Sequence, residues 1–298
     1  MQELLIEIFC NVDDFCIKFE EYCKTILIHQ NYNNANSFKV CSSKTLALSE
    51  IMTIIIYFHL SSYRNFKHYY QRHVSIVLRP YFPELVSYNR FVELMQETLI
   101  PLLLYIKLYR LGKCSGISFI DSTTLDVCDN KRIYSHKVFK GIAQRGKTST
   151  GWFYGFKLHL VVNDSGEILS FFVTPGDVDD RDMEVIEKIS SELFGKLFGD
   201  RGYISQKLYE NLYSRGIQLI TRLKKNMKNK LMLLQDKLLL RKRALIETIN
   251  DFLKNICQIE HSRHRSVVNF MVNLISGIIA YTFLPKKPSI SNKHTYLE

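Results

Sequence analysis

The amino-acid sequence predicts an α/β fold with a mixed sheet, preceded by an all-α N-terminal region. Glycine is absent from residues 1–111, where apolar residues recur at spacings of three and four, as they do along helices. After residue 111, short β-branched and aromatic runs alternate with helical patterns, which is typical of an α/β domain. We therefore expect a helical region over 1–111, an α/β domain over 112–285 and a tail over 286–298.

Composition and charge narrow the class of protein. The 298 residues are 46% hydrophobic and 23% charged, which excludes a disordered tail, a collagen-like fibre and a small disulfide scaffold. Lys and Arg number 40 against 29 Asp and Glu, and the formal net charge of +11 favours a nucleic-acid partner over a membrane surface. The seven cysteines form no Cys-x-x-Cys pair, so we expect reduced thiols in a cytoplasmic protein.

Short helices with turns between them are expected in the N-terminal region. Ser49 and Ser87 are the predicted N-caps of two of them, and Pro101 interrupts the second. Basic residues, among them Lys67 and Arg90, recur along these helices. This pattern is as typical of a helix-turn-helix DNA reader as of an ordinary helical bundle with solvated basic positions, so both interpretations stay open.

The sequence of residues 112–285 predicts three strands, then a helix, a strand, a helix, a strand and a long helical stretch. The first three strands should form an antiparallel set, and the strands joined by helices should pair in parallel. The expected ranges are 114–128, 155–164, 166–176, 180–193, 196–205, 206–216 and 218–223, with the helical stretch starting near Lys230.

Residues 267–284 form an uncharged apolar run, at the lower length limit for a helix that spans a membrane. Asn269 and Asn273 lie inside this run, and basic residues flank it on both sides. We favour a buried helix over a membrane anchor.

Three carboxylates are the candidates for catalysis. Asp121 and Asp200 each follow an apolar strand, 117–120 and 196–198, so both acids are expected at neighbouring strand ends. Their charges repel each other there, and a divalent cation would relieve that repulsion. The third acid, Glu247, lies in a stretch with helical periodicity.

Counting 100° per residue places Arg243, Glu247 and Lys254 along one outward line of that helix, opposite its apolar positions. Carboxylate oxygens favour magnesium or manganese over zinc. Two such cations activate a water or hydroxyl and stabilise the leaving oxygen in phosphodiester cleavage. The three acids together therefore indicate metal-dependent phosphodiester chemistry.

Four stretches, FIDSTTLDV, TPGDVDDRD, LFGDRGY and RALIETINDFLK, resemble the DDE-type insertion-sequence transposases of the RNase H-like superfamily. Four more, YFHLSSYRNFKHYY, SYNRF, GWFYGFKLHL and QIEHSRHRS, are similar to the insertion-sequence group numbered nine-eight-two, so the resemblance covers about residues 40–285. The family signature Tyr-x2-Arg-x3-Glu-x6-Lys is matched at Arg243, Glu247 and Lys254, whereas Leu240 stands at the tyrosine position.

This resemblance implies an RNase H-like mixed-sheet catalytic domain, in which Asp121, Asp200 and Glu247 form a catalytic triad that holds two divalent cations, Mg²⁺ or Mn²⁺. It implies a DNA transposase that binds the terminal inverted repeats of its element, cleaves DNA by hydrolysis and transfers the 3′-hydroxyl end to target DNA. The implied partners are transposon-end DNA, target DNA and at least one more copy of the chain. No membrane is implied, and the implied location is the bacterial cytoplasm, at the nucleoid.

Basic segments at 131–150 and 221–243 flank the acids, and either line the DNA path or form solvated charged faces. Trp152 is a candidate for stacking on an unpaired base, and equally for the core. The acids between Asp177 and Asp182 are expected to be turn and helix-cap residues. The candidate DNA contacts are Arg243, Lys254, Lys147, Trp152, Arg90 and Lys67.

Two other functions stay open on the sequence. A stand-alone RNase H-like nuclease would share the triad and cleave without joining, although it would leave the helical N-terminal region unexplained. The second is an inactive, DNA-binding remnant of a transposase. Leu240 in place of the signature tyrosine favours this interpretation, and the intact set of three acids opposes it.

Overall fold

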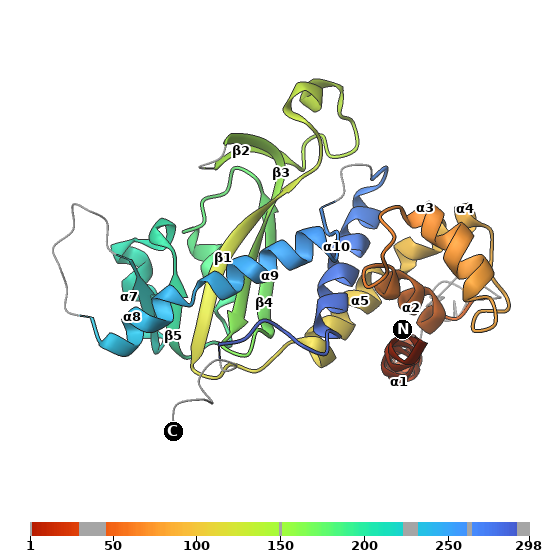
Figure 1. The fold of residues 1–298 in the computed structure, drawn as a ribbon, viewed down its shortest axis with the longest axis horizontal. Helices are drawn as coiled ribbons and strands as arrows, with labels where there is room; N and C mark the ends of the chain where they lie inside the picture. Colours follow the sequence, from red (N-terminus) through yellow and green to blue (C-terminus); the bar gives the residue numbers. More distant parts are fainter. Residues whose placement is uncertain (1, 30–45, 149–150, 223–231, 261–263, 291–298) are drawn as a thin grey trace. The chain divides into compact units, whose positions relative to one another are not determined.

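The computed structural model describes residues 2–29, 46–148, 151–222, 232–260 and 264–290 (Figure 1). The chain forms two compact units. Unit 1 comprises 1–110, 255–259 and 264–283, and unit 2 comprises 111–254, 260–263 and 284–298. Residues 291–298 of the expected tail and residues 223–231 of the basic segment 221–243 lie outside the described residues.

Unit 1 is helical. Its core is rich in aromatic side chains, with the buried rings of Tyr70 and Phe91 4.6 Å apart and the Tyr70 hydroxyl donating to the Val86 carbonyl at 2.7 Å. The elements are α1 (Gln2–His29), α2 (Leu48–Phe58), α3 (Phe66–His68), η1 (Tyr69–Val77), α4 (Tyr88–Met95), η2 (Gln96–Thr98), α5 (Leu99–Tyr105), η3 (Ile106–Arg110) and α10 (Val267–Thr282).

Of the two predicted caps, one is confirmed. Ser87 caps α4 by accepting from the Arg90 amide at 3.4 Å. The prediction for Ser49 is wrong, because α2 begins two residues earlier, with Ala47 as its N-cap. The Glu50 carboxylate accepts the Ala47 amide at 2.7 Å, which satisfies a donor that the helix itself leaves free, while Ser49 is buried in the first turn.

The apolar run at 267–284 is a buried helix, as expected. Helix α10 starts after its N-cap Ser266 and is buried along most of its length. Within the part of the chain that the structure describes, no helix is long and apolar enough to cross a membrane. Helix α10 packs with the helices of unit 1, whereas the sequence pattern grouped it with the α/β domain.

Unit 2 is built on a mixed sheet, which confirms the predicted fold class. Strands β1, β3, β2 and β4 pair antiparallel, and β5 joins β1 and β6 in parallel, giving the order β2-β3-β1-β5-β6 with β4 also on β3. The elements are β1 (Ile117–Asp126), η4 (Asn130–Ser135), β2 (Gln144–Thr148), β3 (Gly151–Asn163), β4 (Ile168–Pro175), α6 (Met183–Ile189), β5 (Gly195–Gly199), η5 (Arg201–Tyr203), α7 (Gln206–Ser214), β6 (Ile217–Thr221), α8 (Leu234–Arg241) and α9 (Ala244–Asn255).

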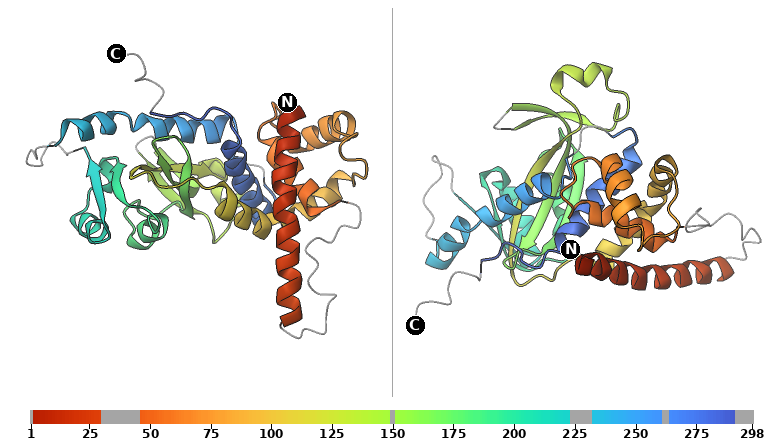
Figure 2. Two further views of the ribbon diagram at one scale, coloured as in Figure 1. Left: turned by 90° about the horizontal axis from the view of Figure 1, so that it is seen from below. Right: turned by 45° about the vertical axis from the view of Figure 1, so that its right-hand side comes forward.

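Helices cover both faces of this sheet. Helices α6 and α7 lie on one face and α8 and α9 on the other, as Figure 2 shows. The first face is sealed by an apolar core that includes Ile120, Ile186, Leu208 and Tyr203. On the other face, the buried Asp236 of α8 accepts from the Lys196 ammonium of β5 at 2.6 Å, which anchors the helix to the sheet.

Two features of unit 2 differ from the expectation. Strand β2 was not predicted, because its sequence QRGKT is polar and mostly exposed and shows no alternation of apolar residues. The expected long helical stretch is two helices in the described part, α8 and α9, which are separated at Lys242 and Arg243.

Candidate active site

Asp121 lies in the middle of β1, not at its end as expected, because the antiparallel pairing with β3 continues to Asp126. The parallel pairing with β5 stops at Phe119, so Asp121 is the second residue beyond it. Successive side chains of a strand point to opposite faces. Ile120 packs into the core beside α6 and α7, and Asp121 therefore faces α9.

Asp200 directly follows β5, as expected. Its side chain caps the short helix η5 by accepting from the Gly202 amide at 2.7 Å. The acid is thus held at the carboxyl end of the strand next to β1. Because β5 pairs in parallel with β1 only up to Phe119, the end of β5 lies beside the middle of β1, close to Asp121.

Glu247 lies in the first turn of α9 and is exposed. Arg243, just before the helix, joins it to Asp121. The Arg243 Nη1 donates to Asp121 Oδ1 at 3.3 Å, and its Nη2 forms an ion pair with Glu247. The expected outward position of Arg243 is wrong, because its side chain is 19% exposed and pairs with two acids.

Asn250 completes the surroundings of Asp121. Its Nδ2 donates to Asp121 Oδ2 at 3.1 Å, and its Oδ1 has no hydrogen-bond partner among the described residues. The sequence analysis missed Asn250. The available signal was a polar residue on the apolar face of α9, between Ile249 and Leu253 and three positions after Glu247.

The three carboxylates influence one another electrostatically. Burial is the main reason why the pKa of Asp121 rises to about 6. The Arg243 guanidinium opposes this rise, and the negative charges of Asp200 and Glu247 add to it. The acids predicted from sequence are therefore close enough in space for each to bear on the protonation of Asp121.

Hard carboxylate oxygens that converge on one positive charge fit a divalent cation in charge and donor chemistry. In this conformation the positive charge is the guanidinium of Arg243. Across the described ranges, no group of three or more His, Cys, Asp or Glu is arranged to hold a metal ion. The structure therefore shows the acids collected around an internal cation, with Asp200 held by its own turn.

Lys254 does not stand free on the outward line of α9. Its ammonium donates to Thr124 Oγ1 at 3.3 Å and pairs with Glu260 at 3.1 Å. Glu260 also accepts the Asp126 amide at 2.8 Å, so this pair ties the end of α9 to the end of β1. The expected outward position of Lys254 is wrong, since about 22% of its side chain is exposed and its charge is shared.

Trp152 and Lys147 lie together on the hairpin formed by β2 and β3, where they are cross-strand partners. The Trp152 ring is 51% exposed, with the Arg145 guanidinium 4.8 Å and the Lys147 ammonium 5.5 Å from its centre. Trp152 is thus a surface aromatic, and not a core residue. Such a ring with two flanking cations can stack on a base and hold a phosphate.

The two candidates in the N-terminal region belong to unit 1. Arg90, on α4, donates to the exposed Glu93 at 2.8 Å. The Lys67 ammonium, on α3, lies 5.8 Å from the centre of the Tyr88 ring. Both are surface residues of the helical unit.

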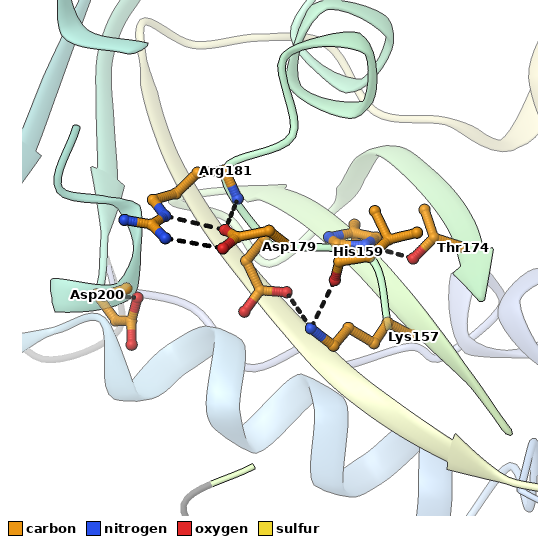
Figure 3. A network of polar contacts seen from close by, with 9 residues as sticks. Lys157, His159, Thr174, Asp179, Arg181 and Asp200 are labelled. Carbon is orange, nitrogen blue, oxygen red and sulfur yellow. Dashed lines mark hydrogen bonds and ion pairs between the residues drawn. The ribbon is translucent and has the colours of Figure 1, made fainter. Parts of the chain in front are cut away.

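A polar network lies beside Asp200 (Figure 3). Lys157 donates to the Val178 carbonyl at 2.8 Å and to Asp180 at 3.2 Å. Asp179 accepts from the Arg181 guanidinium, and Asp182 caps α6. The acids of this segment therefore serve a turn and a helix cap, which confirms that prediction for Asp179 and Asp182.

His159 lies at the buried end of the same network and shares a hydrogen bond with Thr174 at 2.9 Å. Burial is the main reason why the pKa of His159 falls to about 4; Asp180 and Asp182 oppose this, and Lys157 adds to it. The folded protein thus keeps this ring neutral.

A neutral buried histidine makes the stability of unit 2 dependent on pH. The unfolded state binds a proton at its ordinary pKa of 6.5, so stability is lost as the pH falls from 6.5 toward 4. We expect the loss of unfolding free energy between pH 7 and pH 4 to be roughly 3 kcal/mol smaller in His159→Gln than in the wild type. Urea unfolding at pH 7 and pH 4, followed by the fluorescence of the single tryptophan, measures it. An unchanged pH dependence in the variant would exclude His159 as its source.

The strand order β4-β3-β1-β5-β6, with helices on both faces, defines an RNase H-like domain. Residues 111–267 match the family described as Transposase DDE domain. Because this match covers more than half of the chain, the protein belongs to the DDE transposase family. The matched range includes Asp121, Asp200 and Glu247.

The solved structures that are similar to this chain include two transposase complexes. One is a cryo-EM structure of the piggyBac transposase synaptic complex with hairpin DNA, at 10% identity over 93% of this chain and 72% of that one, with a TM-score of 0.48. The other is a crystal structure of the Mos1 strand transfer complex, at 10% identity over 89% and 84%, with a TM-score of 0.23. A search of curated proteins finds no match.

Proposed function

We propose that this protein is the transposase of an insertion sequence of the group numbered nine-eight-two. It binds the terminal inverted repeats, cleaves them by metal-dependent hydrolysis and joins the 3′-hydroxyl end to target DNA. The observation that carries the proposal is the convergence of Asp121 and Glu247 on one positive charge, with Asp200 beside them, in a chain of the DDE transposase family.

In this proposal Asp121, Asp200 and Glu247 hold two magnesium ions, or manganese in their place. Such cations, held by these residues, would activate the attacking water or 3′-hydroxyl and would neutralise charge on the leaving oxygen. The chain's own part is to place the carboxylates. Strand β1 and the turn after β5 fix two of them, and α9 brings the third to the face where Asp121 points.

DNA contacts are proposed for both units. In unit 2, Trp152 and Lys147 offer a stacking ring and a cation on one hairpin, and Lys254 and Arg243 lie next to the acids. In unit 1, Lys67 and Arg90 are proposed to contact the terminal repeats. A homodimer or larger assembly on DNA, and a bacterial cytoplasmic location at the nucleoid, belong to the same proposal.

The hairpin contacts predict a change in salt dependence. Replacing Lys147 by alanine is expected to lower the slope of log binding constant against log salt by about one, because one phosphate contact is lost. Trp152→Ala is expected to weaken binding to single-stranded ends by about 1–3 kcal/mol without changing this slope. A matched control is Lys188→Ala, which removes a lysine paired with Glu184 on α6. A slope equal to that of the wild type in Lys147→Ala would exclude the contact.

Incubating the purified protein with labelled element ends and magnesium tests the proposed function against its rivals. A transposase nicks the ends specifically and then joins them, a stand-alone nuclease nicks without joining, and an inactive remnant binds without nicking. Leu240, at the position of the signature tyrosine, is buried in α8 and lies outside the set of acids. Binding without any nicking would contradict the proposal.

A further inference from the structure

The Arg243 guanidinium contacts two of the carboxylates that are proposed to hold the metal. It has one nitrogen on Asp121 and another on Glu247. A planar guanidinium presents several donors in a fixed fork and carries its charge at all accessible pH values. It can therefore screen two acids from each other. Without it, burial of Asp121 and repulsion between the acids would make their ionised forms costly.

The two oxygens of Asp121 are divided between two partners. Oδ1 accepts from Arg243, and Oδ2 accepts from Asn250. Asn250 is 6% exposed and belongs to the buried face of α9, so its amide is fixed by the packing of the helix. An incoming cation can thus reach Asp121 without disturbing Asn250, provided that Arg243 gives up Oδ1.

Arg243 is placed so that it can leave. It lies in the break between α8 and α9, outside the regular backbone of both helices. Its contacts with the acids are made by the end of a long side chain, so rotation about side-chain bonds would release them without unwinding α9. The Asp121 and Glu247 oxygens that accept from Arg243 would then be available to a cation.

We propose that Arg243 is an internal counter-ion that competes with the divalent cation for Asp121 and Glu247, so that metal binding requires its guanidinium to leave. The inference rests on the proposed function, because it assigns the metal to these acids. It adds that the freed guanidinium becomes available to a DNA phosphate next to the metal. Metal loading and DNA contact by Arg243 are thereby coupled.

The test is a titration of the full-length, metal-free protein with Mn²⁺, in which electron paramagnetic resonance measures the free ion at constant ionic strength. Because the competing charge is gone, Arg243→Gln is expected to bind Mn²⁺ about tenfold more tightly than the wild type. Arg243→Lys, which keeps the charge and loses the fork, should fall between them. Lys242→Gln is the matched control, since it removes the adjacent positive charge without touching the acids, and should stay within about twofold of the wild type.

The variant Asp121→Asn separates this inference from the proposed function. If it loses Mn²⁺ binding while Arg243→Gln and the wild type bind equally, the metal site stands and the competition is wrong. If Asp121→Asn binds as well as the wild type, or no variant binds, both the metal site and the competition are wrong. Binding by Arg243→Gln that is lost in the double variant with Asp121→Asn supports the competition, even where the wild type binds too weakly to measure. Arg243→Lys serves in the same way if the glutamine variant fails to fold.

Discussion

Replacing Asp121 by asparagine is expected to lower the rate of end cleavage by roughly a thousandfold or more, and Asp200→Asn and Glu247→Gln should do the same. Each change removes one negative charge and almost no volume. The loss would therefore come from the missing metal ligand and not from a cavity or a shifted strand. Single-turnover cleavage of labelled element ends in magnesium measures the effect.

The control for this prediction is end binding, which should remain in all three variants because the proposed DNA contacts lie on other residues. Unfolding followed by Trp152 fluorescence checks that unit 2 is intact. Cleavage at the wild-type rate by any one variant, after contaminating nuclease is excluded, would remove that residue from the triad.

Removal of divalent cations is the second change with a large expected effect. Cleavage should vanish in excess EDTA and return when magnesium or manganese is added back, because hard carboxylate oxygens prefer these ions. Zinc should restore little activity, since it favours nitrogen and sulfur ligands, and none of the seven cysteines forms a close pair in the sequence.

Binding of end DNA in EDTA is the companion measurement. It should persist, because backbone phosphates are contacted by lysine and arginine side chains and not through the metal alone. Undiminished cleavage in EDTA would end the two-metal account, whatever the binding data show.

Much of the fold could be predicted from sequence because its signals are local. Strands β1, β3, β4, β5 and β6 are apolar runs bounded by glycine or turn residues, and Asp182 and Ser87 cap the helices that follow them. Strand β2 escaped prediction because an exposed polar strand carries no hydrophobic period. Its existence depends on pairing with β3, which is a tertiary contact.

The structure brings the three acids named from sequence together, but in a geometry that the sequence did not indicate. Asp121 was expected to end its strand because the apolar run ends at Ile120, yet pairing with β3 carries β1 to Asp126. A helical projection gives the direction in which Arg243 and Lys254 leave the helix axis, but not which other element lies in that direction. Arg243 contacts Asp121. Lys254 contacts Thr124 and Glu260.

Asn250 shows the same limit from the other side. In the sequence, Asn250 is only a polar residue on the apolar face of α9. The structure shows that its amide donates to Asp121 of β1. Contacts between segments more than a hundred residues apart set the chemistry of this site, and a single sequence does not specify them.

The most direct test of the central claim is a strand-transfer assay. Element DNA, labelled at the 5′ end of the strand that carries the reactive 3′-hydroxyl, is incubated with the purified protein, magnesium and a target duplex, and joined products are resolved on a denaturing gel. The account predicts that the wild type links the labelled strand to target DNA and that Asp121→Asn forms no joined product. Specific cleavage without any joining by the wild type, or joining by Asp121→Asn, would contradict it.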